Sequence, residues 1–345
     1  MYDAIIVGAG PAGSLSAKKL AEAGLKVLVV EKMKLPRHKM CSGIISSFSK
    51  RILKKEIGEF PEVLCCYPKK SKGIEVYPTK MAPPQKLREN SYNVWRSDFD
   101  FWLNTKASEA GAEIEDQTEL RSFSTQQDCI EVELKTMFGT QKQQAHFLLG
   151  ADGGTSLLRR TLFKQEPMRW FSVYQTYWKG ESNFDPEYFH AFLDRDLTEF
   201  FAWYNVKGGQ KGIYQVFGTA AAKGSMVPQY FNRFQEYLEE GFGFKGEKLL
   251  FREACTAPIF FDPKFEYRFG KGNILLIGES AGLFNVFAEG ISPALQSALD
   301  ASKAILQGGP EVLEAYKKEV QPLCTSLKIG WESLLKMFPH FLELK

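Results

Sequence analysis

The sequence has few cysteines and histidines, and their spacing does not suit a metal site. Its six cysteines include no Cys-x-x-Cys pair, and its four histidines show no metal-like spacing. The adjacent Cys65 and Cys66 suit neither a chelating loop nor an easy disulfide bond. These absences predict a chain without a metal and favour a reducing, cytoplasmic setting.

Long apolar runs are also missing, and so is a strong excess of one charge. No apolar run reaches the length of a transmembrane helix, and no basic segment precedes the apolar start at Tyr2 as it would in a signal peptide. The net charge of +3 predicts no nucleic-acid partner. We expect a soluble, cytoplasmic protein, with contact to a membrane surface as an open alternative. The 345 residues suffice for one large or two ordinary domains.

What the sequence does have is a glycine-rich turn between two apolar segments. Tyr2–Val7 predicts a buried strand, and it is followed at once by GAGPAG, residues 8–13, with the spacing GxGxxG. A helical stretch runs from there to Gly24, and a second strand, Lys26–Val30, ends on Glu31. The order strand, turn, helix, strand and acid predicts a dinucleotide-binding βαβ unit. A glycine-rich turn without a ligand is the alternative, and this context disfavours it.

The chemistry explains the spacing of these residues. Gly8 permits the tight turn, Gly10 lets the backbone approach a pyrophosphate, and Gly13 lets helix and strand pack closely. The helix N-terminus offers N–H groups and a positive dipole end to the phosphates. Glu31 is placed to accept hydrogen bonds from ribose hydroxyls.

The middle of the chain is unusually aromatic. Of 47 aromatic residues, 27 lie between Arg169 and Phe269. Short aromatic strands separated by turns predict an antiparallel sheet from Met168 to Gly218. Packing is the default role of any single ring there, but the density as a whole favours an apolar, ring-lined substrate pocket.

Several helices and one strand are predicted around this region. Arg96 opens a helix with Asp98 as its N-cap, and Pro228–Glu240 is amphipathic. A buried strand is predicted over Asn273–Ile277. The sequence also predicts a helix that starts at Ser292-Pro293 with a hydroxyl cap, and helical stretches around Glu311–Thr325 and Trp331–Phe341.

Two later motifs make the nucleotide site resemble a flavin site. Asp152-Gly153-x-x-Ser156-x-x-Arg159 follows a buried strand, and ILLIGESAG, residues 274–282, precedes Glu289-Gly290-Ile291. With the N-terminal turn they resemble the FAD-dependent oxidoreductases of the para-hydroxybenzoate hydroxylase type. Within that class, PRHKMCSG, residues 36–43, and the helix after Val94 are similar to segments of the geranylgeranyl reductase family. The resemblance covers about residues 1–305.

The resemblance implies FAD as cofactor and gives the candidate residues roles. The ADP half would be held by Gly8, Gly10, Ala12, Gly13 and Glu31, with Arg96 and Asp152 at the pyrophosphate and Leu120 near the adenine. Glu279 would bind the ribityl chain, where the family has Asp. Gly290 and Ile291 would place N–H groups by the flavin N1–C2=O edge, toward which the dipole of the following helix would point.

Other roles follow from the same resemblance. Cys41, Ser42 and Gly43 would lie by the flavin ring, with Cys41 either a redox or proton-relay thiol or a small apolar residue in a packed turn. Arg37 and Lys39 either bind an anion or are solvated loop charges. The segment from Phe201 to Trp203 resembles the start of the family's YxWxFP segment, with Asn205 and Val206 in place of FP, and both aromatic residues are expected in the substrate pocket.

The expected fold is α/β (α+β overall). It has a Rossmann-like FAD-binding domain with a parallel sheet and an inserted, mostly antiparallel β substrate domain. The FAD-binding domain is expected at 1–70, 96–165 and 270–305, the substrate domain at 71–95 and 166–269, and C-terminal helices at 306–345.

The sequence thus predicts an FAD-dependent oxidoreductase of the geranylgeranyl reductase family. Hydride from reduced flavin N5 would pass to a C=C bond of an apolar small molecule, for which an isoprenoid is one candidate. Because no dedicated NAD(P)H-binding domain is expected, the electron donor would be NAD(P)H that visits the flavin transiently or a ferredoxin-like protein. A flavin monooxygenase or halogenase acting on an aromatic substrate is one alternative, and a flavin-bound electron carrier without its own substrate is another.

Overall fold

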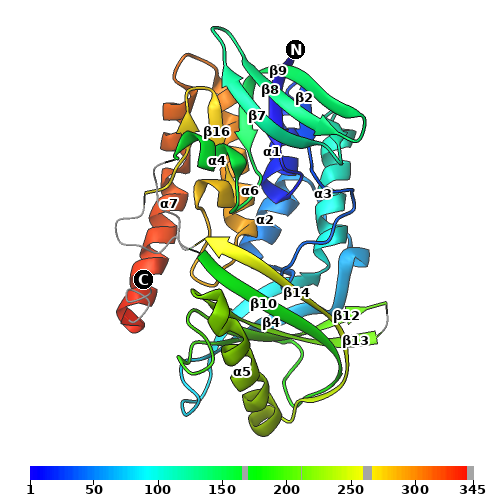
Figure 1. The fold of residues 1–345 in the computed structure, drawn as a ribbon, viewed down its shortest axis with the longest axis vertical. Coiled ribbons are helices and arrows are strands. Elements are labelled where there is room, and N and C mark those ends of the chain that lie inside the picture. Colours follow the sequence, from blue (N-terminus) through cyan, green and yellow to red (C-terminus); the bar gives the residue numbers. More distant parts are fainter. Residues whose placement is uncertain (165–169, 211, 259–265, 340–345) are drawn as a thin grey trace. The chain divides into compact units, whose positions relative to one another are not determined.

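The computed structural model describes residues 1–164, 170–210, 212–258 and 266–339, which form two compact units (Figure 1). The first unit is Met1–His38, Ser97–Pro167 and Phe260–Lys336, and the second is Lys39–Arg96, Met168–Ile259 and Met337–Lys345. Residues 39–70, which the sequence assigned to the FAD-binding domain, are grouped with the second unit. The functional division into domains stays a prediction.

The first unit is built on an eight-stranded sheet with a parallel centre. Its strands are β1 (Tyr2–Val7), β2 (Val27–Val30), β6 (Glu113–Glu115), β7 (Glu119–Thr125), β8 (Ile130–Thr136), β9 (Gly139–Gly150), β15 (Gly270–Lys271) and β16 (Ile274–Leu276). The order is β15-β16-β9-β1-β2-β6, and the pairs β16–β9, β9–β1, β1–β2 and β2–β6 are parallel. The hairpin of β7 and β8 is joined antiparallel to β9. β2 is apolar and buried along its whole length, and so is β1 apart from the half-buried Asp3, as a parallel sheet covered on both faces requires.

α-Helices and a short 3-10 helix, labelled η, complete this unit. They are α1 (Pro11–Glu22), α3 (Arg96–Glu109, whose first residue belongs to the second unit), α4 (Leu157–Leu162), η3 (Gly278–Ala281), α6 (Ile291–Gln307) and α7 (Val312–Met337). α1 packs against α6, where the hydroxyl oxygens of Ser16 and Ser302 are 2.9 Å apart.

The second unit is an eight-stranded, almost entirely antiparallel sheet. Its strands are β3 (Ile44–Ile45), β4 (Cys65–Tyr77), β5 (Gln85–Val94), β10 (Trp170–Glu181), β11 (Tyr188–Phe192), β12 (Ala202–Gly209), β13 (Gly212–Ala221) and β14 (Lys245–Pro258), in the order β14-β10-β13-β12-β11-β4-β5-β3. Only the pair of β11 and β4 is parallel among these described strands. The remaining elements are α2 (Ser47–Glu56), η1 (Glu62–Leu64), η2 (Gly224–Met226) and α5 (Val227–Phe242). A parallel sheet in one unit and an antiparallel sheet in the other confirm the predicted fold class.

One face of this second sheet forms the main aromatic core, on which α5 packs (Figure 1). The buried cluster consists of Tyr77, Phe184, Phe192, Leu197, Ala202, Tyr204, Val206, Phe217, Phe231, Phe234, Leu238 and Phe244. Tyr174, Trp178, Tyr237 and Phe242 pack against it. Much of the aromatic density that the sequence favoured as a substrate pocket is therefore accounted for by packing between the sheet and α5.

The structure corrects three predicted helix boundaries. α3 begins at Arg96, so Asp98 lies inside its first turn and is not the N-cap. α6 begins at Ile291 with Gly290 as N-cap and no side-chain cap, so Pro293 is not its first residue. The two predicted C-terminal stretches form one helix, α7, which contains Pro322.

The continuity of α7 has a physical reason. Buried residues recur every three or four positions along one face, at Tyr316, Val320, Cys324, Leu327, Trp331 and Leu334. This packing outweighs the helix-breaking tendency of Pro322. Phe341, where the sequence ended its last helix, and Met168, where it began its first aromatic strand, lie outside the described residues. Within the described part of the chain, no helix combines the length and the apolar character needed to cross a bilayer.

Candidate functional site

The glycine turn has the geometry that its spacing predicts. Gly8 has a φ of +105°, which favours glycine, and a Cβ on Gly13 would lie 1.9 Å from the Gly8 carbonyl oxygen. Only a glycine at position 13 therefore lets α1 lie this close to the turn. Gly10 is the N-cap of α1, has an extended backbone and provides no side-chain cap. The N-terminus of α1 therefore presents the backbone N–H groups of its first turn, including those of Ala12 and Gly13.

Glu31 is buried at the end of β2 and held against the turn. Its carboxylate accepts hydrogen bonds from the backbone N–H of Ala9 and of Met33, both at 3.1 Å. Arg37 Nε lies 3.0 Å from Glu31 Oε2, and Arg37 Nη1 lies 3.0 Å from Asp100 Oδ2. Arg37 is thus a largely buried bridge between two carboxylates, whereas Lys39 is exposed. The sequence had treated the two cations alike.

Two residues of α3 that sequence reasoning missed also hold the turn. Asp100 binds Arg37, and Asn104 donates from Nδ2 to the Ala9 carbonyl at 3.2 Å and accepts from the Ser14 hydroxyl at 3.4 Å. Both are buried on the face that carries Phe99. The sequence feature that could have revealed them is a pair of polar residues four positions apart on an otherwise apolar helix face. The predicted pyrophosphate ligand, Arg96, is half-buried as the first residue of α3.

Leu120 lies on a segment that passes Glu31. Backbone hydrogen bonds of 2.9 Å join Glu31 N to Glu115 O and Thr118 N to Glu31 O. Leu120 follows as a buried residue of β7. The structure therefore brings the segment before Leu120 to the acid that was predicted to bind the ribose, and the contact of Leu120 with the adenine stays a prediction.

Asp152 follows β9 directly and lies beside Gly8. A Cβ on Gly8 would come within 3.1 Å of the Asp152 Cα and within 2.5 Å of the Ala151 carbonyl oxygen. Asp152 Oδ2 accepts a hydrogen bond from Leu157 N at 2.7 Å, while its buried Oδ1 has no hydrogen-bond partner in the described part of the chain. Burial raises the pKa of this carboxyl. An unpaired oxygen at the glycine turn suits a group that donates a hydrogen bond.

Glu279 reaches the same place from η3. A Cβ on Gly153 would lie 3.6 Å from Glu279 Oε2, which brings the second and third motifs together. Gly278 has a φ of +62°, and a Cβ on it would lie 3.3 Å from the Ala12 Cβ. The third motif therefore also adjoins the glycine turn. Buried Arg159 donates to the Ser280 carbonyl at 3.2 Å and so anchors η3 to α4.

Gly290 and Ile291 form the start of α6, but this helix end already holds a carboxylate. Glu289 Oε1 accepts hydrogen bonds from Ser292 N at 2.6 Å and from the Ser292 hydroxyl at 3.0 Å. Asn285 in turn donates from Nδ2 to Glu289 Oε2 at 3.1 Å. The positive end of the dipole is thus partly complemented by Glu289, which weakens the dipole argument for a flavin edge there.

The second unit holds the other candidate residues. Gly43 N donates to Cys41 Sγ at 3.3 Å, and a Cβ on Gly43, whose φ is +75°, would lie 2.0 Å from the Val94 carbonyl oxygen. Buried Lys207 donates to the Ser42 carbonyl at 2.8 Å and to the Val94 carbonyl at 2.6 Å. Lys207, which the sequence did not single out, therefore fixes the segment around Cys41.

The predicted substrate residues, Phe201 and Trp203, lie next to each other at the start of β12. Their ring centroids are 5.5 Å apart. Trp203 is buried and donates from Nε1 to Gln175 Oε1 at 2.8 Å, whereas Phe201 is half-buried. Their role in binding a substrate stays a prediction.

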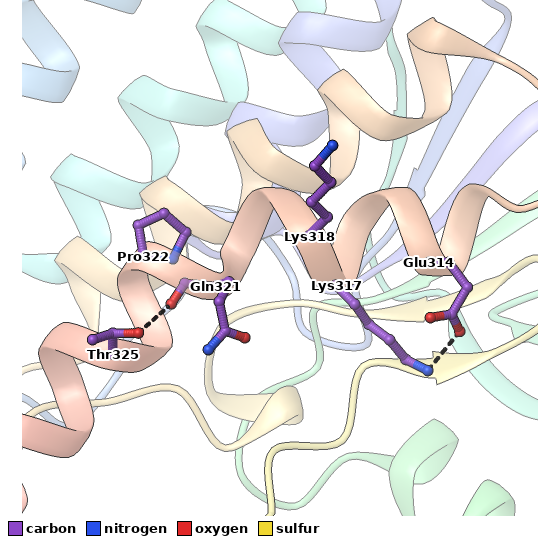
Figure 2. Close-up of a pocket in the computed structure, with 6 residues that line it drawn as sticks. All are labelled: Glu314, Lys317, Lys318, Gln321, Pro322 and Thr325. Atoms are coloured by element: carbon purple, nitrogen blue, oxygen red, sulfur yellow. Dashed lines mark hydrogen bonds and ion pairs between the residues drawn. The ribbon is translucent and has the colours of Figure 1, made fainter.

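A hollow along α7 does not coincide with any of these residues. Figure 2 shows that its lining comes from α7 alone: Glu314, Lys317, Lys318, Gln321, Pro322 and Thr325. Within it, Lys317 Nζ lies 2.7 Å from Glu314 Oε1. A surface on one helix with paired charges offers no candidate chemistry.

The first unit fits an FAD molecule at the glycine turn. Gly8, Gly10, Ala12, Gly13, Glu31, Asp152 and Glu279 are brought together there, and Leu120 follows the segment beside Glu31. Gly8 and Gly13 leave no room for side chains, and Asp152 Oδ1 has no hydrogen-bond partner among the residues that the structure describes. Cys41, Ser42, Gly43, Arg96, Phe201 and Trp203 belong to the second unit, and Gly290 and Ile291 start α6. The individual roles stay predictions.

Comparison with known proteins agrees with this fit. The family model described as "FAD binding domain" matches residues 1–327. The protein CbrA of Escherichia coli O6:H1 is 27% identical over 331 residues, which cover 93% of this chain and 86% of that protein. A geranylgeranyl bacteriochlorophyll reductase-like protein of Thermoplasma acidophilum has a similar fold, with a TM-score of 0.80, 18% identity and coverage of 99% of this chain and 86% of the other.

A second solved structure, the myxobacterial chondrochloren halogenase, has a TM-score of 0.74 and 16% identity, with coverage of 97% of this chain and 82% of the halogenase. At these identities the two structures establish the fold alone. The family model, in contrast, spans nearly the whole chain. The chain therefore belongs to the FAD-binding-domain family, and it is an FAD-dependent oxidoreductase.

Proposed function

We propose that this oxidoreductase reduces a carbon–carbon double bond of a largely apolar, isoprenoid-like small molecule. The similarity to a geranylgeranyl bacteriochlorophyll reductase-like protein over 99% of the chain supports this reaction class. The observation that carries the proposal is the environment of Cys41, because reduction of a double bond needs a proton as well as a hydride. FAD in its reduced form supplies the hydride.

In this proposal Cys41 supplies the proton. The hydride adds to one carbon of the double bond, and the thiol proton moves to the other carbon, which leaves a thiolate at Cys41. The Gly43 N–H, 3.3 Å from Sγ, stabilises that thiolate by a hydrogen bond. Cys41 is half-buried, so the thiolate regains its proton from water. Lys207 keeps the segment in place through the Ser42 carbonyl.

The proposal is tested by anaerobic reoxidation of the reduced holoenzyme. The protein is reduced with NADPH, NADH or a reduced ferredoxin, which are the donors we propose, and then mixed with geranylgeraniol, a quinone or an aromatic compound. We expect geranylgeraniol to restore the oxidised flavin spectrum. Cys41→Ala should slow that step by about 100-fold or more while FAD stays bound, because a general acid contributes on that order. Cys255→Ala, another half-buried cysteine of the second unit, should react like the wild type.

A flavin-dependent halogenase or monooxygenase is the second candidate, and the fold similarity to the chondrochloren halogenase favours it. Such an enzyme needs O₂, so it would leave the reduced flavin unchanged under anaerobic conditions with every acceptor. Rapid substrate-stimulated O₂ consumption together with anaerobic inactivity would contradict the reductase proposal. Contact with a membrane surface stays a prediction, which the use of vesicle-bound geranylgeraniol can test.

A further inference from the structure

Opposite its aromatic core, the sheet of the second unit has another face that carries buried polar side chains among aromatic ones. Along β12, alternate residues point to opposite faces, as in any strand. Ala202, Tyr204 and Val206 belong to the core cluster under α5. Trp203, Asn205 and Lys207 therefore share the other face, with all three side chains buried.

Neighbouring strands add further polar groups to this face. In the register of the sheet, Tyr177 of β10 pairs with Val216 of β13, and Val216 pairs with Asn205 of β12. Tyr177 and Val216 form a small cluster of their own with Tyr214 and the partly buried Trp95. Asn205 thus lies two strands from Tyr177 in the same row.

The polar neighbours of Asn205 have hydrogen-bond partners. Gln175 accepts from Trp203 Nε1 at 2.8 Å and donates to the Tyr177 hydroxyl at 2.6 Å, and that hydroxyl donates to Glu253 Oε1 at 2.8 Å. A side chain at Gly218 would collide with the Trp203 ring, so glycine there lets Trp203 reach Gln175 across β13. Lys207 donates hydrogen bonds to the carbonyls of residues 42 and 94 and to Asn93 Oδ1.

Asn205 differs from these neighbours. Only 2% of the residue is exposed, yet neither Oδ1 nor Nδ2 has a hydrogen-bond partner in the described part of the chain. Asn93, which is equally buried, uses both amide atoms: Nδ2 donates to the carbonyls of Tyr67 and Val206, and Oδ1 accepts from Lys207. Buried polar groups without partners are rare because leaving them unpaired is costly, and each one calls for an explanation.

We infer that Asn205 recognises the substrate, and that the substrate carries at this point a hydroxyl or carboxamide group, which can accept from Nδ2 and donate to Oδ1. This inference rests on the proposed function and specifies its substrate as an unsaturated molecule with a polar head, not a plain hydrocarbon. The position also departs from the family-like pattern: Asn205 stands where a phenylalanine was expected from the YxWxFP segment. A primary amide has both a donor and an acceptor, which phenylalanine lacks.

The first test compares thermal unfolding of two variants of the FAD-bound protein. Asn205→Leu keeps the shape of the side chain and removes an amide without partners, so we expect the unfolding midpoint to rise by about 2–4 °C. Asn93→Leu is the matched control. It removes an equally buried amide whose nitrogen and oxygen both have hydrogen-bond partners, so it should lower the midpoint. If Asn205→Leu lowers the midpoint as Asn93→Leu does, the amide is structural and the inference is overturned.

The second test measures specificity by anaerobic reoxidation with two probes, geranylgeraniol and the hydrocarbon that lacks its hydroxyl. We expect the wild type to react at least about 100-fold faster with the alcohol, because a site built for a hydroxyl discriminates strongly against its absence. Asn205→Leu, and Asn205→Ser as a smaller second variant, should retain FAD and lose this preference. A preference that persists in both variants overturns the role of Asn205 alone. A wild type that reacts with neither probe overturns the proposed function itself.

Discussion

At the scale of single residues, Arg37 shows how a buried cation orders the glycine turn. Its side chain is 11% exposed, and those of its two partners, Glu31 and Asp100, are 6% and 1% exposed. Removing Arg37 would take a buried positive charge away from both carboxylates. We therefore predict that Arg37→Leu lowers the free energy of unfolding by about 3–5 kcal/mol in urea denaturation. FAD should also be retained less well, because Glu31 loses the group that orients it.

The matched control for this prediction is Lys39→Leu. Lys39 is exposed two residues further along the chain, so its loss should change the free energy of unfolding by no more than about 0.5 kcal/mol. Equal effects of the two substitutions would mean that the Arg37 ion pairs contribute no more than a surface charge.

At the scale of elements, β12 holds a distant segment through one side chain. Lys207 Nζ binds the carbonyls of Ser42 and Val94 and the side chain of Asn93, all more than 100 positions away in the sequence. Lys207→Met would leave these acceptors without their donor, and we predict a loss of about 2–4 kcal/mol in the free energy of unfolding. Faster hydrogen exchange at residues 41–43 should accompany it.

Lys179→Met provides the comparison for Lys207. Lys179 also lies on a strand of the second unit, but its side chain is 61% exposed and its ion pair with Glu247 spans 3.3 Å at the surface. Such pairs contribute about 0–1 kcal/mol. If the two lysine variants were equally stable, the proposed role of Lys207 in fixing the Cys41 segment would be wrong.

Elements whose signal is local could be predicted from the sequence, and contacts between distant strands could not. The turn at Gly8–Gly13, β1, β2 and Glu31 follow one another within thirty-one residues, so spacing alone revealed their geometry. β14 carried no comparable signal, because only its last residue is buried and its polar and apolar residues do not alternate in the sequence. The bond between Trp203 and Gln175 depends on three strands in register and on Gly218, which no local pattern specifies.

At the scale of the whole molecule, composition was the least specific guide. The aromatic excess correctly pointed to an antiparallel sheet, but composition does not say on which face a ring lies. The register puts Tyr204 and Phe217 under α5 and Asn205 on the opposite face. A substrate inferred from aromatic content is therefore apolar throughout, whereas one inferred from the buried amide of Asn205 has a polar head.

The stability of the whole molecule should also depend on pH through a buried acid outside the candidate site. Asp300 of α6 accepts from Gln296 Nε2 at 2.8 Å, and its buried Oδ2 has no partner in the described part of the chain. The pKa of this carboxyl is raised from 3.8 to about 6, mainly by burial; the hydrogen bond from Gln296 lowers it, and the charges of Glu319 and Lys303 have smaller, opposite effects. On α7, burial raises the pKa values of Tyr316 and Cys324, and the charge of Asp300 raises both further.

The pKa of Asp300 is higher in the folded state than in the unfolded chain, so protonation of this group stabilises the fold. The contribution is complete below about pH 4, where the acid is protonated in both states. That contribution is lost as the pH rises through about 6, since the unfolded chain ionises first. The difference of about two pKa units corresponds to roughly 3 kcal/mol. We predict that the wild type loses about this much stability between pH 4 and pH 7 relative to Asp300→Asn, whose side chain does not titrate. Urea unfolding of both proteins across this range measures the difference, and a difference that stays constant with pH would show that Asp300 titrates normally in the fold.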